Sequence, residues 1–384
     1  MSKGVYLGVD GYARKVKSMY IGVDGVARKI KKAYLGVEGY ARLFYSSEEI
    51  RKSDVSVSNM RNSHIYGASA SADSHAVFAG GASSNYVDAY DSYLTKTSPT
   101  NLSNKVNGVC GCGFNGYSVF AGGSNTMGSY FNTVDSYSAS MVKTSLTNLS
   151  IKRANAVMTH TTNYVFVVGG ANRDGPVDTS EVYNAQLVKV SNASFGMAEN
   201  IGGVYCMGYG ILYGGMYNYG GSVSISKYID YVDDELTLKG NTHLERGAHS
   251  CAGATASRYA LFAGGDAAFD GSVVSTVWAC DSSDLSVRSI SPLPVAVRNL
   301  AGVSLEGYAI FAGGWDGDMS SGKSVGVVVL YDSNLTQKVS YLNIERGYLL
   351  GASVGNFGLF AGGVNGEGTS TTNMISVEAF EYGG

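Results

Sequence analysis

The stretch AIFAGG (residues 309–314) decides the fold, because its pattern returns seven times along the chain. Each copy is a short apolar run that ends in two glycines, and successive pairs are 42, 47, 45, 50, 49 and 49 residues apart. The pairs are Gly80-Gly81, Gly122-Gly123, Gly169-Gly170, Gly214-Gly215, Gly264-Gly265, Gly313-Gly314 and Gly362-Gly363. A period of about 45–50 residues made of short apolar runs and turn residues is typical of a β-propeller, with one repeat per blade.

Each repeat has the pattern of four strands. The first begins near a basic residue, and the second is the apolar run before the glycines. A variable loop follows, and the third strand ends in an aromatic residue, at Tyr90, Tyr137, Tyr183, Tyr231 and Tyr331. The fourth begins with segments such as LTKTS (residues 94–98) or LTQKV (residues 335–339). Because no helical periodicity interrupts this pattern, we predict an all-β, seven-bladed propeller over residues 54–384.

The repeats resemble kelch repeats, the blades of the galactose-oxidase/kelch superfamily, over residues 55–384. The glycine pair and the later tyrosine carry the resemblance, while the late tryptophan of the family is absent and Cys280 and Phe380 replace the tyrosine in two repeats. The resemblance implies that the loops after the glycine pairs and those before the first strands open on one side of the disc. Galactose oxidase uses copper and a tyrosine–cysteine crosslink. No equivalent ligands can be placed here, so we expect neither a cofactor nor that activity.

The two ends of the propeller are predicted to meet. The chain ends just after the third strand of the seventh repeat, in SVEAFEYGG (residues 376–384), and IRKSDVSVSNM (residues 50–60) resembles an unpaired fourth strand. We therefore expect Asp54–Ser58 to complete the last blade and remove an open edge, with residues 46–53 as a linker. Deleting residues 50–60 is then expected to destabilise the domain severely.

Residues 1–45 carry a different repeat, a 14-residue phrase that occurs three times as YLGVDGYARKV, YIGVDGVARKI and YLGVEGYARLF. Asp-Gly or Glu-Gly between β-forming runs indicates a hairpin, so we predict three of them. Isolated hairpins are marginal in water, so these are expected to gain stability from a copy of themselves or from a host surface. The segment resembles short repeats at the start of tail or baseplate-associated proteins of phages and prophages of Gram-positive bacteria. That resemblance implies attachment or oligomerisation.

Charge and hydropathy narrow the classes of partner. Residues 1–45 hold nine Lys/Arg and three Asp/Glu, about +6, which leaves 19 against 28, about −9, for the rest. The basic residues of the repeats could bind nucleic acid or a membrane surface, or they could be solvated side chains that protect strand edges. The acidic charge of the remaining chain argues against nucleic acid as the main partner. The first residues, MSKGVYLGVD, lack the pattern of a secretory signal peptide. The sequence contains no run of 18 apolar residues, so we expect no membrane insertion. We expect a protein made in a host cytoplasm.

The chemically reactive residues form no known catalytic or metal-binding motif. The five cysteines (Cys110, Cys112, Cys206, Cys251 and Cys280) are irregularly spaced and read as buried thiols, and no histidine pair has metal-ligand spacing. We also find no pair of carboxylates that recurs at one position of the repeats. The sequence therefore predicts no metal, no catalytic residue and no enzymatic activity.

A basic residue recurs near the start of the first strand in six of seven repeats. These residues are Arg61, Lys105, Arg153, Arg246, Arg298 and Arg346, and Met197 takes the place in the fourth repeat. One reading is a positive ring at one mouth of the channel that captures a carboxylate, a phosphate or a sulfated sugar. The other reading is strand-to-strand hydrogen bonding inside the channel. Both remain open from the sequence.

The loops after the glycine pairs diverge while the scaffold repeats, as expected of a surface that presents variable contacts. They carry large rings among polar residues: Tyr86, Tyr130, Phe131, Tyr217, Tyr219, Phe269 and Trp315. Such rings suit sugars, whose C–H faces stack while their hydroxyls form hydrogen bonds, and equally suit protein epitopes. With the arginines above, we select Phe131, Tyr217, Tyr219 and Trp315 as candidate ligand contacts.

The sequence thus favours a non-enzymatic receptor-binding or adhesion protein of a phage tail or phage-derived particle. The propeller loops would bind a bacterial surface glycan or surface protein, and residues 1–45 would dock to tail or baseplate proteins or to a second copy. One alternative is a protein-interaction or structural propeller with a self-assembly tag. A third reading, a glycan lyase or hydrolase, lacks nameable acid and base residues.

Overall fold

The computed structural model describes residues 6–9, 12–15, 19–23, 26–30, 32–37, 40–46, 49–193, 199–219, 222–244, 247–267, 272–318 and 320–383. Every regular element in these ranges is a β-strand, which confirms the predicted all-β class. No helix among them is long and apolar enough to cross a membrane. The chain divides into two units, Met1–Ser53 with Phe380–Gly384, and Asp54–Ala379.

The N-terminal repeats form three two-stranded antiparallel sheets, as predicted. They pair β1 (Tyr6–Val9) with β2 (Tyr12–Lys15), β3 (Met19–Val23) with β4 (Val26–Ile30), and β5 (Lys32–Val37) with β6 (Tyr40–Ser46). The last paired residues of each hairpin, such as Val9 and Tyr12, leave two residues between the strands. That is the loop length expected for Asp-Gly and Glu-Gly turns, whose own residues lie outside the described ranges.

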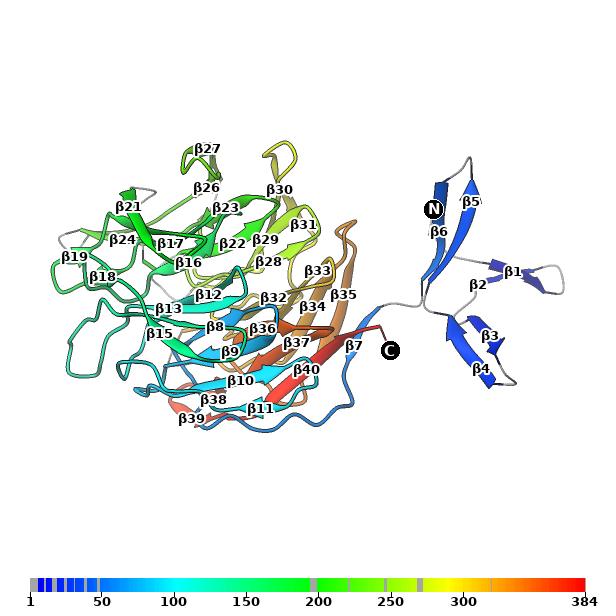
Figure 1. Ribbon diagram of the computed structural model, residues 1–384, viewed down its shortest axis with the longest axis horizontal. Coiled ribbons are helices and arrows are strands. Elements are labelled where there is room, and N and C mark those ends of the chain that lie inside the picture. Colours follow the sequence, from blue (N-terminus) through cyan, green and yellow to red (C-terminus); the bar gives the residue numbers. More distant parts are fainter. Residues whose placement is uncertain are drawn as a thin grey trace. The chain divides into compact units, whose positions relative to one another are not determined.

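The remaining strands build seven four-stranded antiparallel blades around a central channel (Figure 1). The first two blades, from the channel outward, are β8 (Ala68–Ser71), β9 (His75–Ala79), β10 (Val87–Asp91) and β11 (Lys96–Thr97), then β12 (Cys110–Phe114), β13 (Tyr117–Ala121), β14 (Val134–Tyr137) and β15 (Lys143–Ser145). The next two are β16 (Val157–His160), β17 (Tyr164–Val168), β20 (Ser180–Asn184) and β21 (Lys189–Ala193), then β22 (Gly202–Cys206), β23 (Tyr209–Tyr213), β26 (Tyr228–Val232) and β27 (Leu238–His243).

The fifth and sixth blades are β28 (Ala252–Ala256), β29 (Tyr259–Ala263), β30 (Val277–Asp281) and β31 (Val287–Ile290), then β32 (Ala301–Leu305), β33 (Tyr308–Ala312), β34 (Val327–Tyr331) and β35 (Gln337–Tyr341). The seventh is β36 (Leu350–Val354), β37 (Phe357–Ala361), β40 (Val377–Tyr382) and β7 (Ile50–Lys52). Three small hairpins extend loops that follow glycine pairs: β18 (Ala171–Asn172) with β19 (Gly175–Pro176), β24 (Met216–Tyr219) with β25 (Ser222–Ile225), and β38 (Val364–Glu367) with β39 (Ser370–Asn373).

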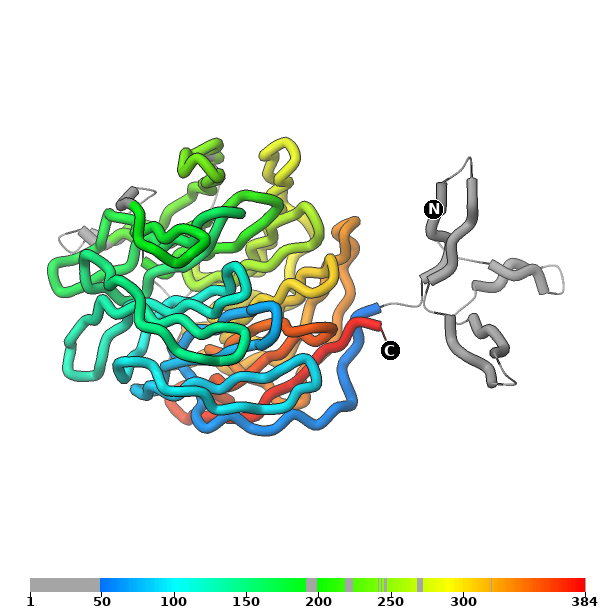
Figure 2. Tube along the Cα trace, in the orientation of Figure 1, coloured from blue at the N-terminus to red at the C-terminus, as the bar shows by residue number. Residues whose placement is uncertain are grey.

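The seventh blade is completed by a strand from the start of the chain, but not by the one we predicted. The blue and red ends of the tube meet at β7 and β40 in Figure 2, where Lys52 pairs with Phe380 and Ile50 with Tyr382. The predicted segment, Asp54–Ser58, has no regular structure. The physical reason is the length of β40, which continues to Tyr382 and so places its partner strand earlier in the chain, within the stretch assigned to the linker.

The glycine pairs are required where neighbouring blades meet. Both glycines of every pair have positive φ, for example 67° at Gly313 and 120° at Gly314. Gly314 N donates to Arg346 O, in the segment leading to the next blade, at 2.9 Å. A Cβ on Gly313 would lie 2.4 Å from that same carbonyl, so a side chain does not fit. The motif that revealed the repeats therefore makes the contact between blades.

Four of the recurring tyrosines connect the core of their blade to the segment that precedes it. Tyr137 is fully buried, and its ring meets Phe120 of the second strand edge to face at 6.1 Å. Its hydroxyl donates to Thr100 O at 2.8 Å. The hydroxyls of Tyr90, Tyr183 and Tyr331 donate to carbonyls in the equivalent connections, those of Ser58, Thr147 and Ser291. One residue type thus packs the blade and anchors the segment that enters it.

A belt of backbone hydrogen bonds links the starts of the innermost strands. Seven residues there have φ between 51° and 63°: Tyr66, Gly108, Asn155, Asn200, Ser250, Asn299 and Tyr348. Six bonds join them in sequence, from Gly108 N to Tyr66 O at 2.7 Å through to Tyr348 N to Asn299 O at 2.9 Å. The Tyr66 and Tyr348 rings, 5.3 Å apart, bridge the junction between the last blade and the first. The belt defines one mouth of the channel.

Candidate functional site

The loops that follow the glycine pairs form the surface we call the crown, which comprises the described residues 82–86, 124–133, 171–179, 216–219, 222–227, 266–267, 272–276, 315–318, 320–326 and 364–376. They lie on the same side as the belt, because the first strand of a blade starts opposite the glycine end of the second, as in the pair Ala68–Ala79. Neighbouring crown loops are bonded to one another. Arg173 Nε donates to Gly128 O at 3.1 Å, and Gly368 N donates to Gly322 O at 2.7 Å. The crown is therefore a preformed surface across several blades.

Two arginines of the predicted basic ring lie in the interior. Arg346 is fully buried and donates from Nη1 to Ser376 O at 2.9 Å and from Nη2 to Glu378 Oε1 at 2.9 Å. Arg153, also fully buried, makes the same bonds in its blade, to Thr179 and Glu181. Burial lowers the pKa of Arg346, and the charge of Glu378 opposes that shift. Their predicted role as ligand contacts is wrong, because each guanidinium is buried and hydrogen-bonds the glycine pair and the third strand of its own blade.

The other described arginines of the ring are also paired with carboxylates. Arg61 Nε lies 3.1 Å from Asp88 Oδ1, and Arg298 Nη1 lies 2.9 Å from Asp266 Oδ2. Lys105 is exposed, whereas Arg246 and Met197 lie outside the described residues. The recurring bases do not form one ring of equivalent side chains, because the number of residues between the base and the following glycine pair differs from repeat to repeat. These four arginines therefore do not form a ring of unpaired positive charge that could bind an anionic ligand.

Single carboxylates that pair with these bases recur in the third strands, a pattern that our sequence analysis did not identify. Asp88, Asp135, Glu181 and Glu378 each stand two residues before the aromatic residue of a third strand. Lysines of the fourth strands reach three of them, with Lys96, Lys143 and Lys189 within 3.2 Å of Asp88, Asp135 and Glu181 respectively. Although burial disfavours the charged form of Asp88, bonds from His64 and from the Arg61 backbone hold its pKa well below its usual range. The acidic-x-aromatic triplet was the signal that sequence analysis missed.

The aromatic candidates of the crown separate into supporting and surface residues. Trp315 is fully buried, its Nε1 donates to Asp318 O at 2.9 Å, and its ring lies 6.3 Å from that of Tyr348, so its predicted ligand contact is wrong. Phe131 is half-buried against the core of the first two blades. Tyr217 is half-buried on β24, and the side chain of Tyr219 lies outside what the structure describes. Tyr86 is 39% exposed, with the Arg61 guanidinium 4.7 Å from its ring centre.

A small pocket opens at the belt, and we call it the mouth pocket. Its volume is about 170 Å³, and it is lined by Tyr66, Gly67, Ser250, Cys251, Asn299, Leu300, Tyr348, Leu349 and Leu350. Tyr66 is 51% exposed there, and Tyr348 is supported from behind by Trp315. Burial and the neighbouring Tyr66 raise the pKa of Tyr348 to about 12, so its hydroxyl stays protonated at neutral pH. Two rings and several polar groups thus converge at the mouth.

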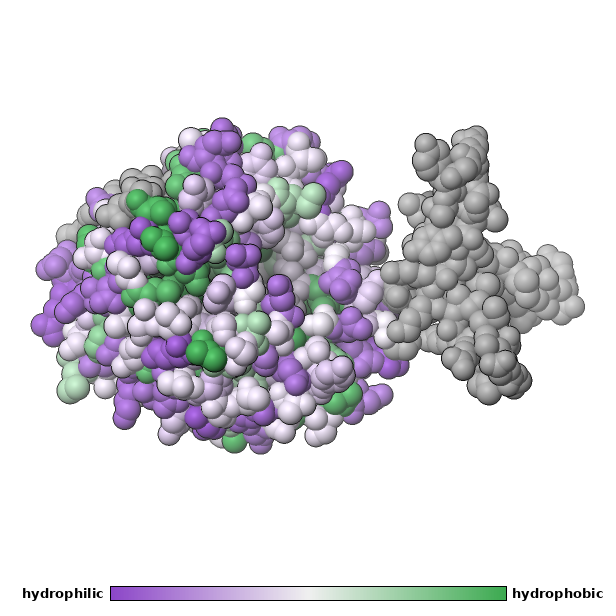
Figure 3. Space-filling view, in the orientation of Figure 1, coloured by the Kyte–Doolittle hydropathy of each residue, from purple (hydrophilic) through white to green (hydrophobic). Residues whose placement is uncertain are grey.

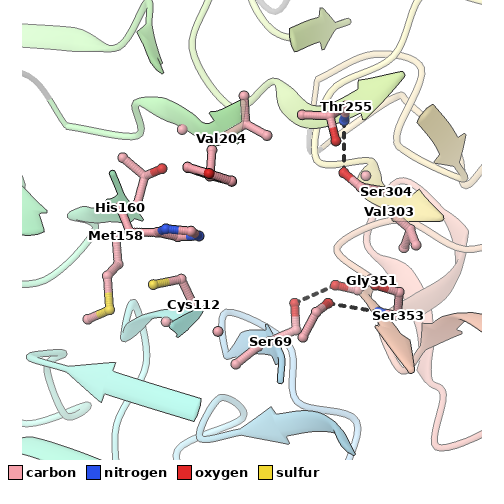
Figure 4. Close-up of a pocket in the computed structure, with 18 residues that line it drawn as sticks. Ser69, Cys112, Met158, His160, Val204, Thr255, Val303, Ser304, Gly351 and Ser353 are labelled. Carbon is pink, nitrogen blue, oxygen red and sulfur yellow. Dashed lines mark hydrogen bonds between the residues drawn. The ribbon is translucent and has the colours of Figure 1, made fainter. Parts of the chain in front are cut away.

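The channel itself holds a second cavity, of about 280 Å³, lined by residues of all seven innermost strands (Figure 4). Most of the wall is backbone and small side chains. Hydroxyls also tie adjacent strands, since Ser69 Oγ donates to Gly351 O at 2.7 Å and Thr255 N donates to Ser304 Oγ at 2.8 Å. Larger side chains, those of Cys112, Met158 and His160, gather on one side. Among the described residues, no group of three or more His, Cys, Asp or Glu is placed to hold a metal.

His160 projects from β16 into this channel (Figure 4). Its ring stacks on Tyr205 at 4.2 Å, and Nδ1 lies 2.7 Å from Thr161 O, so Nδ1 donates and Nε2 of the neutral ring is the acceptor. Burial lowers the pKa of His160 below its ordinary value, and the bond to Thr161 opposes the shift. The folded protein therefore favours the neutral imidazole.

Acidification is expected to destabilise the protein through this histidine. Below about pH 6.5 the unfolded chain binds a proton that the folded His160 resists, so the free energy of unfolding falls as pH drops towards the lowered pKa. His160→Gln should reduce the fall measured by urea unfolding at pH 7.5 and 5.5. The variant should keep part of it, because burial also lowers the pKa of His75 and His249. An unchanged difference between the two pH values would contradict the assignment.

All five cysteines are free thiols, as the sequence indicated. Burial raises the pKa of Cys110, Cys251 and Cys280 to about 12 and that of Cys206 to about 11. Burial also raises the pKa of Cys112, which lines the channel. The thiolate is the reactive form, so all five thiols stay protonated and weakly reactive at neutral pH, and the buried Cys110, Cys206 and Cys280 act as small apolar core residues.

Comparison with known proteins supports the fold. No protein-family model matches the sequence, and no curated protein matches it. Among solved structures, that of YjhT is similar with a TM-score of 0.55 at 16% identity, over 71% of this chain and 93% of that one. At this identity the likeness concerns the fold alone, and β-propellers serve both enzymes and binding proteins. The chain is a seven-bladed β-propeller, similar in fold to YjhT.

Proposed function

We propose that this chain is a non-enzymatic receptor-binding or adhesion protein of a phage tail or phage-derived particle. The crown would bind a bacterial surface glycan, and the hairpins of residues 1–45 would dock to the particle or to a second copy. The observation that carries the proposal is the crown: loops of divergent sequence stand on a scaffold of repeated blades, and hydrogen bonds join neighbouring loops of the second and third blades and of the sixth and seventh. In many binding proteins a rigid scaffold carries loops of variable sequence that determine specificity, and preformed loops lose less entropy on binding.

The division of the chain supports separate binding and attachment roles. The hairpin repeats belong to a different unit from most of the propeller and repeat with their own period. Several copies held on one particle would turn weak binding at each crown into strong overall binding. We also keep kelch-type repeats as the proposed class of these blades, because the glycine pairs and third-strand tyrosines recur as in that family.

The recurring carboxylates of the third strands are poor candidates for the acid and base of a glycosidase. Most glycosidases use two carboxyl groups that flank the scissile bond. In this propeller the recurring carboxylates Asp88, Asp135, Glu181 and Glu378 are engaged in ion pairs with neighbouring bases. The alternative function, a protein-interaction or structural propeller with a self-assembly tag, would use the same crown for a protein epitope.

The test is binding of the purified full-length chain, and of a 47–384 fragment, to envelopes from a panel of Gram-positive species. We expect both to bind the envelope of at least one species, with polysaccharide extracted from that species competing and protease treatment of the envelope having no effect. Protease-sensitive binding would favour the protein-interaction alternative. Release of reducing sugar from the extract would contradict the non-enzymatic assignment, and no binding across the panel would reject the receptor-binding role.

A further inference from the structure

The innermost strands place a polar ring in the channel at one register position. In every blade the fourth residue of the innermost strand pairs with the second residue of the next strand, as Thr255 does with Ala260 and Ser304 with Ala309. All seven of these fourth residues line the channel cavity of about 280 Å³. Six have side chains that can form hydrogen bonds, namely Ser71, His160, Tyr205, Thr255, Ser304 and Ser353, and the seventh is Gly113.

Four neighbouring blades, from the fifth through to the first, contribute small hydroxyls to this ring: Thr255, Ser304, Ser353 and Ser71. Two of them are held by backbone groups, since Thr255 N donates to Ser304 Oγ and Ser353 N donates to Ser71 Oγ, both at 2.8 Å. Within the described ranges, none of the four hydroxyl protons donates to a protein acceptor. The arc can therefore donate hydrogen bonds to a molecule in the channel and accept them from it.

The third and fourth blades contribute aromatic rings at the same level of the channel. The rings of His160 and Tyr205 stack at 4.2 Å with 15° between their planes, and Phe114 of the second blade lies 5.4 Å from His160. Figure 4 shows His160 on one side of the cavity, with Thr255 and Ser304 on the other. The stack holds the ring of Tyr205 in place, so the cavity has an aromatic side and a hydroxyl side.

No Asp, Glu, Lys or Arg of the described chain lines this cavity, and its ionisable side chains are those of Cys112, His160 and Tyr205. Burial raises the pKa of Cys112 and lowers the pKa of His160, so both groups favour their neutral forms at neutral pH. A charged ligand would lose hydration in the channel without gaining a counter-charge. The lining therefore favours a polar ligand that carries no charge.

We propose that the channel cavity binds one uncharged sugar ring, whose hydroxyls bond to the arc from Thr255 to Ser71 and whose C–H face packs on Tyr205. The cavity volume of about 280 Å³ is just below the roughly 300–1,000 Å³ of sites for drug-sized molecules, which suits a single ring. This inference goes beyond the proposed function, because the cavity lies inside the channel, whereas the envelope glycan is assigned to the crown.

The experiment is calorimetric titration of the full-length chain at pH 7.5 with the methyl glycosides of glucose, galactose and N-acetylglucosamine. Glucuronate and glucosamine serve as the acidic and basic counterparts of these neutral sugars. At least one neutral glycoside should bind, and it should bind at least tenfold more tightly than either charged sugar.

Two variants test the two sides of the cavity. Thr255→Val removes one hydroxyl and should weaken binding of that glycoside about fivefold, as expected for one lost hydrogen bond. Tyr205→Ala removes the packing surface and should weaken it about tenfold or more. Thr336→Val is the matched control, because Thr336 is exposed in the turn between β34 and β35, outside the cavity lining, and it should bind as the unmodified protein does.

Each outcome decides for or against the site. Binding of no neutral glycoside, or equally tight binding of glucuronate or glucosamine, overturns the inference. If a neutral glycoside binds and both variants, shown by thermal melts to be folded, bind it as tightly as the unmodified protein, the sugar lies outside the channel and the inference falls. Thr255→Val decides alone should Tyr205→Ala not fold. These titrations do not depend on envelope binding, so the channel site and the receptor-binding role can fail separately.

Discussion

Removal of β7 is expected to lower the melting temperature of the propeller more than removal of all the hairpin repeats. A chain starting at residue 54 loses the β7 ladder to β40, the buried Ile50 side chain, and the bonds from Arg51 Nε and Ser53 Oγ to Glu381 at 2.8 and 2.9 Å. At about 1 kcal/mol per hydrogen bond and about 2 kcal/mol for the isoleucine, the loss is roughly 5 kcal/mol. That corresponds to roughly a 10 °C drop for a domain of this size.

The matched comparison is between chains 47–384 and 54–384, which both lack β1 to β6. Thermal melts followed by near-ultraviolet circular dichroism should separate them, and the shorter chain should also aggregate, because β40 becomes an open edge. In the full-length chain, Ile50→Asp should act in the same direction, whereas Arg51→Ala should cost little, since that side chain is 57% exposed. Identical melts for the two truncated chains would show that β7 does not close the propeller.

Breaking the buried pair between Arg346 and Glu378 is expected to have the second large effect. Arg346→Met leaves Glu378, which is 8% exposed, without its guanidinium partner, and also removes the bonds to Ser376. Loss of one member of a buried pair costs about 3–5 kcal/mol, because the remaining charge stays desolvated. Urea unfolding of Arg346→Met should show a loss of this size.

A double-mutant cycle tests the reason for that loss. Arg346→Met combined with Glu378→Leu removes both charges, so it should be less destabilising than the sum of the two single changes. Arg61→Met serves as the exposed counterpart, because its side chain is 31% exposed and its partner Asp88 keeps His64 and Lys96. Strict additivity in the cycle, or an equal loss for Arg61→Met, would contradict the role of a buried pair.

The large exposed apolar side chains of the described residues are distributed over several blades. The face seen in Figure 3 is mainly hydrophilic, with apolar residues scattered between polar ones. Single exposed apolar residues are normal on a soluble protein, so attention falls on places where rings and polar groups converge. The mouth pocket is such a place, and its residues come from four different blades.

Much of the fold was predictable because its requirements are local and repeated. A glycine pair at the end of an apolar run indicates a backbone with positive φ, and both glycines of all seven pairs have positive φ. A tyrosine in the third strand reports a ring that packs inside the blade. Both patterns, the glycine pair and the third-strand tyrosine, span only a few residues, so they can be recognised in a single sequence.

The candidate site was less predictable, because it depends on contacts between repeats. Trp315 stands in a polar loop of the sixth repeat, but Tyr348 of the seventh and the turn at Asp318 bury it. For Arg153 and Arg346 the sequence left open whether they contact a ligand or hydrogen-bond strands, and the position of their carboxylates decides for the second. Tyr66 gave no signal, since it lies before the first strand and gains its partner only when the two ends of the repeat series meet.

The sequence by itself determined the all-β class, the seven blades, the three hairpins and the positions of the glycine pairs and core tyrosines. Only the tertiary structure decided which strand completes the last blade, which arginines are buried, and where aromatic and charged side chains converge. The physical reason is that local periodicity specifies backbone conformation within a repeat, whereas burial and ion pairing depend on distances between residues that come together only when the ring of blades closes.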